Sequence, residues 1–126
     1  MELLRKLTFP VFTKSGIESH QLLFPENSAS LRLTITRVVV HPGAINSRHK
    51  HETAEQVWVA LEGKGVLLLE GGRTESFEAG DVARFHDGDT HGFENTGQQP
   101  FTYLSITSPP LNFRSAYAAE QAAARQ

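Results

Sequence analysis

Histidines are the residues of this chain best placed to do chemistry. Five of the six lie between residues 41 and 91, and two of them, His49 and His51, are separated by one residue. Residues i and i+2 of a β-strand point to the same face, so in a strand the two imidazoles could converge on one ion. A third imidazole must then come from elsewhere in the fold. A His-X-His pair alone is more often structural or exposed than metal-binding, so its surroundings decide its meaning.

The chain contains no cysteine among its 126 residues. Disulfides, thiolate metal sites and cysteine nucleophiles are therefore excluded. Any metal must be bound through nitrogen and oxygen. Imidazole and oxygen ligands suit iron, zinc, nickel or manganese, with copper also possible, and the sequence does not choose among these divalent ions.

Two segments around these histidines resemble the two sequence motifs of the cupin family. The first motif is a glycine, five residues, His-X-His, three or four residues, a glutamate, six residues and a glycine. Residues 43–63 follow this pattern from Gly43 through His49 and His51 to Gly63. The pair of motifs, in order and within one short chain, is much more specific than either motif alone.

The second motif is a glycine, five residues, a proline, one residue, a glycine, two residues, a histidine, three residues and an asparagine. Residues 80–95 match it at Gly80, Gly88, His91 and Asn95. The chain thus resembles a small single-domain cupin of the cupin-2 type, with an RmlC-like jelly roll. The resemblance implies an all-β cupin double-stranded β-helix, and a metal site that includes His49, His51 and His91.

Two positions depart from the family pattern. Gln56 stands where the family usually has its glutamate, and Glu55 is the rival. Gln56 satisfies both spacings, whereas Glu55 leaves seven residues before Gly63 and would face the opposite side of the strand unless a bulge intervenes. We therefore expect Gln56 in the metal site, either as a ligand or as a hydrogen-bonding neighbour of one. His86 replaces the proline, which leaves that turn less rigid.

A glutamine ligand would change the charge of the site. A carboxylate cancels one unit of the metal's charge, and an amide cancels none. Three imidazoles and an amide leave the full charge of a divalent ion, which weakens its binding, favours an anionic ligand from solution and makes the ion a stronger Lewis acid.

The elements that must position these residues are short strands with turn signals between them. We expect strands at residues 31–40, 56–61, 66–70, 73–77, 82–85 and 101–107, with turns at 63–65, 71–72, 79–81 and 96–100. Such spacing, with glycine and proline between the strands, indicates an all-β sandwich or barrel. No helical pattern separates the strands, which excludes a run of βαβ units.

Three parts of the chain are expected. Residues 1–30 are an N-terminal arm or one extra strand laid against the barrel, residues 31–110 are the cupin barrel, and residues 111–126 are a C-terminal helical tail. The tail is predicted from its alanine-rich composition over residues 115–126. At that length the helix needs packing to be stable.

The pocket and its chemistry follow from the same motifs. If Gln56 and His91 face inward, Trp58 and Phe93 are candidates for an apolar pocket wall, although core packing is the commoner role of such a phenylalanine. His86 and Glu55 are weak candidates for moving protons. The resemblance implies a metal-dependent enzyme on a small organic substrate, of oxygenase, isomerase, cyclase or lyase type. The alternative is a non-catalytic module that binds or senses a small anionic ligand through its metal.

Partners and location are constrained by composition and pattern. The net charge is −2 and no basic stripe stands out, so nucleic acid is not expected as a partner. No apolar run reaches the length of a membrane span and no signal peptide is apparent, so we expect a cytoplasmic protein with no membrane partner. The strand at 56–61 is apolar on both faces, and the family resemblance favours a homodimer.

Overall fold

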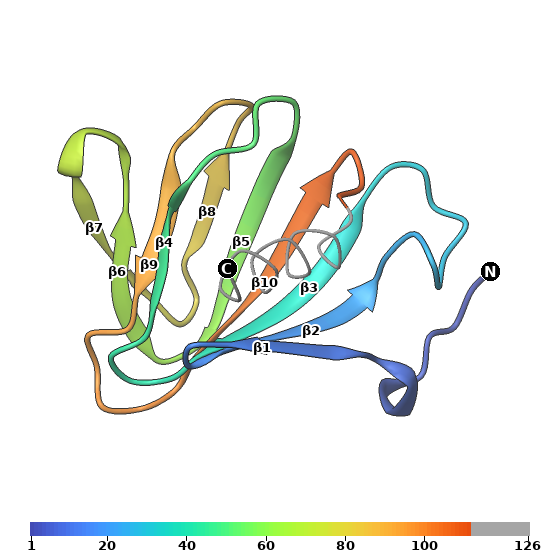
Figure 1. Cartoon of the computed structure of the whole chain (residues 1–126), viewed down its shortest axis with the longest axis horizontal. Coiled ribbons are helices and arrows are strands. Elements are labelled where there is room, and N and C mark those ends of the chain that lie inside the picture. The colour runs from blue at the N-terminus through green and yellow to red at the C-terminus, as the bar shows by residue number, and fades with distance from the viewer. Residues whose placement is uncertain (112–126) are drawn as a thin grey trace, which may run out of the picture.

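The computed structural model describes residues 1–111, which fold into two antiparallel sheets that face each other (Figure 1). The six-stranded sheet has the order β1-β2-β3-β10-β5-β8, and the four-stranded sheet has the order β4-β9-β6-β7. The strands are β1 (Val11–Lys14), β2 (Ile17–Leu23), β3 (Thr34–Val40), β4 (Ile45–His49), β5 (Glu55–Glu62), β6 (Lys64–Leu68), β7 (Thr74–Glu78), β8 (Val82–Phe85), β9 (His91–Glu94) and β10 (Phe101–Ser108). Two short 3-10 helices, η1 (Lys6–Thr8) and η2 (Glu70–Gly72), complete the described elements.

An aromatic core fills part of the space between the sheets. Phe93 stacks on Phe101 with ring centroids 4.2 Å apart, and Phe77 contacts both rings. Tyr103 joins this cluster to Trp58. These five side chains are at most 2% exposed. The all-β jelly roll expected from the sequence is thereby confirmed, while the expected C-terminal helix lies outside the described residues.

Most predicted strands appear close to their expected positions. β8 has the predicted bounds, and β5 and β10 are longer than predicted by one or two residues. β3 begins at Thr34 rather than at residue 31. The hydroxyls of Ser28 and Ser30 accept hydrogen bonds from the backbone N–H groups of Ser30 and Arg32, and such local bonds compete with strand pairing.

The turn between β5 and β6 is tighter than predicted. Gly63 alone has the positive φ, at 86°, and Lys64 and Gly65 already belong to β6. Gly65 is a glycine for a different reason, because a Cβ at this position would lie 2.3 Å from Cζ of Phe93. The strand therefore passes directly over the ring that fills the core.

The N-terminal region forms a hairpin rather than a single strand. β1 pairs with β2 across Ser15 and Gly16, whose φ angles of 45° and 83° are those of a type I′ turn. β2 in turn pairs with β3, so the hairpin extends the six-stranded sheet. Ile17, Ser19 and Gln21 of β2 are buried. Within residues 1–111, no helix is long and apolar enough to cross a membrane.

Candidate metal centre

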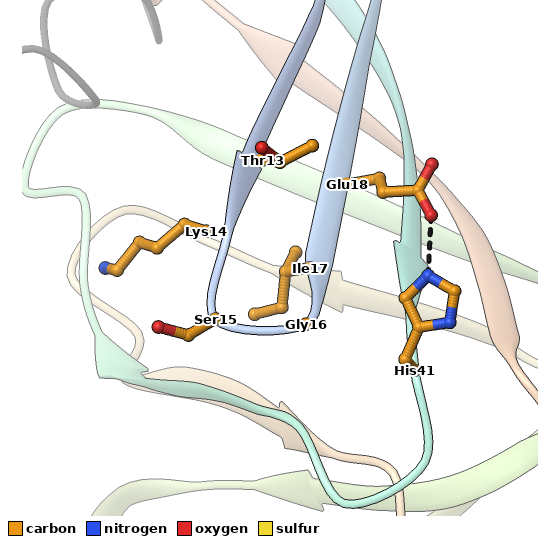
Figure 2. Close-up of a pocket in the computed structure, with 7 residues that line it drawn as sticks. All are labelled: Thr13, Lys14, Ser15, Gly16, Ile17, Glu18 and His41. Carbon is orange, nitrogen blue, oxygen red and sulfur yellow. Dashed lines mark hydrogen bonds and ion pairs between the residues drawn. The ribbon is translucent and has the colours of Figure 1, made fainter.

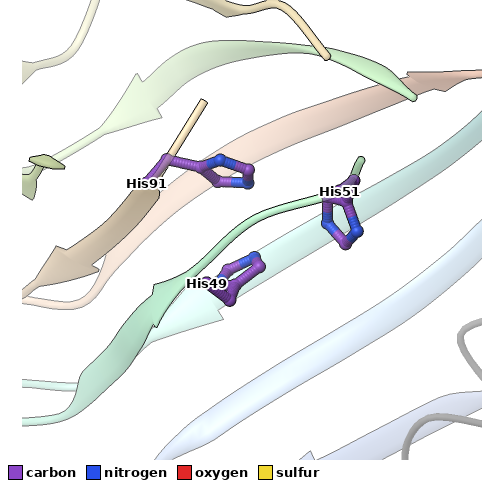
Figure 3. Close-up of side chains that lie close together, drawn as sticks. All are labelled: His49, His51 and His91. Atoms are coloured by element: carbon purple, nitrogen blue, oxygen red, sulfur yellow. The ribbon is translucent and has the colours of Figure 1, made fainter. Parts of the chain in front are cut away.

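Three histidines meet between the two sheets. His49 is the last residue of β4, His51 follows two residues later, and His91 is the first residue of β9. One ring nitrogen from each lies within 4.8 Å of the other two, a spacing that allows all three to bind one ion (Figure 3). The sequence expectation that these three side chains converge is met by the geometry.

The histidine pair reaches this arrangement differently from the way we expected. His49 and His51 do not share one strand, because β4 ends at His49 and His51 lies in the following loop. The pairing of β4 with β9 also shifts register between Asn46 and His49. Backbone irregularity therefore aims the two rings, whose centroids are 5.2 Å apart.

Backbone carbonyls orient two of the rings. Nδ1 of His49 lies 2.7 Å from the carbonyl oxygen of Ser47, and Nδ1 of His91 lies 2.9 Å from that of Asp89. A carbonyl only accepts, so Nδ1 carries the proton in each ring and Nε2 keeps its lone pair. Nε2 of His51 is buried and has no hydrogen-bond partner among the residues that the structure describes. Nε2 of His49 and Nε2 of His91 thus offer lone pairs to one cation, and the ring of His51 brings a third nitrogen within 4.8 Å of the other two ligand atoms.

Gln56 has a fixed orientation beside these rings. Its Oε1 accepts a hydrogen bond from Nε1 of Trp58 at 3.1 Å, and its Nε2 donates to Oγ1 of Thr107 at 2.9 Å. The indole N–H is only a donor, so the Gln56 atom that faces it must be the oxygen. The same oxygen lies 3.1 Å from Nε2 of His91. The amide therefore presents an acceptor, not a donor, to the histidine cluster.

The contact between His91 and Gln56 fits a bound cation. Burial is the main cause that lowers the pKa of His91 to about 4, with the charge of His49 as a further cause, so the ring is neutral at pH 7. A neutral imidazole has one N–H group, and in His91 this group is at Nδ1, which donates a hydrogen bond to the carbonyl oxygen of Asp89. Nε2 of His91 and Oε1 of Gln56 then face each other with lone pairs, an arrangement that a cation between them stabilises. The donor set of three nitrogens and one oxygen suits a first-row divalent metal.

Aromatic rings hold the buried side of the centre in place. Phe85 stacks on His91 with centroids 4.4 Å apart and planes 13° apart, and Trp58 meets the same ring edge-on at 5.3 Å. His91 is 2% exposed. Burial also lowers the pKa of His51, with the charge of His49 as the lesser cause. The surroundings thus favour the neutral imidazoles that a metal requires.

A cavity of about 570 Å³ opens next to the histidine cluster. His49, His51, Gln56 and Trp58 are among the residues that line it. Arg48 and Lys14 also line it, and none of its lining residues within the described chain is acidic. The cavity therefore has room for a small organic molecule and an electrostatic preference for an anion.

Of the other site candidates, the structure places one at the cavity and three away from it. Trp58 lines the cavity as expected, whereas Phe93 is fully buried and packs on Phe101 in the core. His86 is exposed and its Nε2 pairs with Asp89 at 3.3 Å. Glu55 lies on the face of β5 opposite Gln56, where Arg84 donates a 2.7 Å hydrogen bond to it. Neither His86 nor Glu55 is among the residues that line the cavity.

Sequence reasoning missed a polar wall of the cavity. Its side chains come from the N-terminal hairpin and from two neighbouring strands: Ser19 and Gln21 of β2, Thr36 of β3, and Ser105 of β10. All four residues are buried. Ile17, Ser19 and Gln21 occupy alternate positions of one strand, which is the signal that was available in the sequence. Two of the three are polar, so a search for alternating apolar residues does not identify this buried face.

A second hollow, of about 410 Å³, lies at the turn between β1 and β2 (Figure 2). Its ionisable groups are Lys14, Glu18 and His41. Nε2 of His41 donates a hydrogen bond to Glu18, and this bond is the main cause that lowers the pKa of Glu18. Because Glu18 and His41 pair with each other, this hollow lacks the converging free donor atoms of the histidine cluster.

Comparison with known proteins agrees with this geometry. The cupin domain model matches residues 36–107. An uncharacterised protein of Methanocaldococcus jannaschii is 30% identical over 105 residues, which are 82% of each chain. The oxalate-binding protein of Thermotoga maritima is 30% identical over 93 residues, 74% of this chain and 76% of that protein. The solved structure of KdgF from a Halomonas species superposes with a TM-score of 0.77 at 17% identity, covering 90% of this chain and 98% of KdgF. The chain belongs to the cupin domain family.

Proposed function

We propose that this protein is a metal-dependent enzyme that acts on a small, oxygen-rich organic substrate. Its divalent ion is bound by Nε2 of His49, His51 and His91 and by Oε1 of Gln56. The observation that carries the proposal is the convergence of three imidazole nitrogens beside a cavity of about 570 Å³. Structural metal sites are closed by their ligands, whereas catalytic sites keep a position open for water or substrate.

The charges around the centre favour an anionic substrate. All four proposed ligands are neutral, so a divalent ion would keep its full charge. Lys14 and Arg48 add positive charge to the lining of the cavity, which has no carboxylate among its described residues. A carboxylate or enolate oxygen would therefore enter more readily than a cation or a hydrocarbon.

The side chains around the centre position and shield it. Trp58 holds the Gln56 oxygen toward the histidines, and the carbonyl of Asp89 holds the His91 ring in the tautomer that leaves Nε2 free. Phe85 covers the other side of that ring, which excludes water from it. A bound divalent ion would supply Lewis acidity toward a substrate oxygen. The described cavity lining has no carboxylate to act as a general base.

The test begins with metal content. Purified protein is analysed for metals, then stripped and reloaded separately with Fe²⁺, Zn²⁺, Ni²⁺ and Mn²⁺. Each form is incubated with a panel of hydroxy acids, keto acids and phenols, while substrate loss is followed by NMR and oxygen uptake by electrode. We expect one bound ion per chain and turnover of at least one compound class by one metal form.

Matched histidine variants serve as controls. His49→Ala and His91→Ala should lose both the ion and turnover. His41→Ala should keep both, because His41 bonds to Glu18 outside the cluster. Absence of metal from every reloaded form, or equal occupancy in the His91→Ala variant, would contradict the proposal.

A second candidate function is a binding module that anchors a small anion at the ion without transforming it. Two observations favour this candidate: the lack of an acidic residue in the described cavity lining, and 30% identity to an oxalate-binding protein. Metal-loaded protein that binds oxalate or a related acid in calorimetry, yet transforms no member of the panel, would support the binder over the enzyme.

We also propose that two copies associate through the outer face of the six-stranded sheet. Val59 of β5 and Leu104 of β10 are directly paired neighbours on this face, and both are only half-buried. Ile106 lies on the same face of β10, and Val82 at the β8 edge is 65% exposed. An apolar sheet face of this kind is typical of an interface between protein chains.

A further inference from the structure

A row of inward-facing side chains crosses the six-stranded sheet from the N-terminal hairpin to the metal centre. Strand register places Gln21 of β2 opposite Thr36 of β3, Thr36 opposite Ser105 of β10, and Ser105 opposite Trp58 of β5. All four of these residues line the cavity. One end of the row therefore lies next to the Gln56 oxygen, and the other end lies three strands away.

Two members of this row have polar side-chain atoms without a partner in the described part of the chain. Nε2 of Gln21 and Oγ1 of Thr36 are buried and make no hydrogen bond with any of residues 1–111. Gln21 is 3% exposed and Thr36 is 5% exposed. A buried donor without an acceptor destabilises a fold by about 1–3 kcal/mol, so native proteins rarely keep one without a use. Both residues line the cavity, where a bound molecule could supply the missing acceptors.

The chemistry of this wall is neutral. Its side chains are the amide of Gln21 and the hydroxyls of Ser19, Thr36 and Ser105, with no charged group among them. An amide N–H and hydroxyls pair well with hydroxyl or carbonyl oxygens. A second carboxylate would instead be expected to meet an arginine or lysine. The wall is therefore suited to the uncharged, oxygen-bearing part of a ligand.

The wall is also distant from the ion. In the six-stranded sheet, β2 with Gln21 lies three strands away from β5, which carries Gln56, and β3 with Thr36 lies two strands away, while neighbouring strands are about 4.8 Å apart. A two-carbon acid held at the metal would not reach Gln21. A longer molecule would contact both ends of the cavity at once.

We propose that Gln21 and Thr36 form a second subsite, which binds the hydroxyl or carbonyl oxygens of the substrate end away from the metal. The substrate class is then a polyhydroxylated carboxylic acid of at least four carbons, with its carboxylate end at the ion and its hydroxyl end on this wall. This inference rests on the proposed metal-dependent function and specifies the substrate of that same site.

The experiment compares acids that share one metal-binding end and differ in length. Calorimetric titration of metal-loaded protein with glycolate, which has two carbons, and with erythronate, which has four, gives two dissociation constants. We expect erythronate to bind about tenfold more tightly or better, because two or more added hydrogen bonds of ordinary strength are worth this factor. Gln21→Leu and Thr36→Val should each weaken erythronate binding about threefold to tenfold and leave glycolate within about twofold.

Thr34→Val is the matched control. Thr34 lies on the same strand and face as Thr36, and its hydroxyl is also buried without a partner within residues 1–111, but it does not line the cavity. Thr34→Val should leave both dissociation constants unchanged, and circular dichroism checks that each variant is folded. Wild-type protein that carries its ion but binds erythronate no better than glycolate, or not at all, overturns the subsite alone. An equal loss in all three variants also overturns it, whereas protein that never takes up metal overturns the proposed function.

Discussion

The low pKa of His91 predicts how stability depends on pH in metal-free protein. Burial lowers this pKa from the usual 6.5 to about 4. Between about pH 6.5 and pH 4, His91 is therefore protonated in the unfolded chain and neutral in the folded chain. Because the unfolded state binds more protons in this range, the free energy of unfolding falls as the pH falls, and it is level above about pH 6.5. Burial of His51 acts in the same direction.

The magnitude follows from the gap between the two pKa values. A gap of about 2.5 units, at about 1.4 kcal/mol per unit, amounts to about 3 kcal/mol once the pH is below 4. About 2.5 kcal/mol of this loss should already be present at pH 4.5, since the folded ring is then still mainly neutral. That loss is a large part of the stability of a domain of this size.

The assay is urea unfolding of chelator-treated protein at several pH values from 7.5 to 4.5, followed by circular dichroism. The His91→Asn variant removes the titrating ring, so wild type should lose about 2.5 kcal/mol more than this variant over that interval. Parallel curves for wild type and His91→Asn would refute the reasoning, because they would mean that His91 is protonated equally in both states.

Three further results are expected. Gln56→Glu should raise affinity for Mn²⁺ about tenfold or more in chelator competition. Unit charges 4 Å apart attract by about 4 kcal/mol at an effective dielectric of 20, and the desolvation of a buried carboxylate offsets part of this gain. Unchanged affinity would place this side chain away from the ion. Gln21→Leu should raise the unfolding free energy of ligand-free protein by about 1 kcal/mol in urea titration, because it removes a buried amide nitrogen that has no partner among the described residues. A clear loss of stability would mean that this nitrogen already has a partner. Leu104→Asp should halve the mass found by sedimentation at micromolar concentration, while a monomeric wild type would contradict the proposed dimer.

The fold could be predicted from the sequence because its strands and turns carry local signals. Gly63 and the apolar residues of β5 and β10 mark elements that appear within one or two residues of their expected bounds. The histidine cluster could be predicted because two motifs fix His49, His51 and His91 at set spacings. The local shape was not predictable: β4 ends at His49, and the aim of His51 depends on a loop and a register shift.

The polar wall was not predictable for a different reason. Periodicity identifies buried strand faces by their apolar residues, and a face that lines a cavity carries polar ones. Ser19 and Gln21 therefore carry no apolar signal, although the pairing of β2 with β3 turns them inward. His86 and Glu55 were predicted as proton-transfer candidates from their positions in the motifs. In the structure both lie at the surface, where His86 pairs with Asp89 and Glu55 pairs with Arg84.

Anomalous diffraction from crystals of metal-loaded protein is the most direct test of the proposed centre. We predict a single strong peak with Nε2 of His49, His51 and His91 and Oε1 of Gln56 all at about 2.0–2.2 Å, and with an open side toward the cavity. A peak elsewhere on the molecule, or a cluster that stays without a peak at saturating metal, would contradict it.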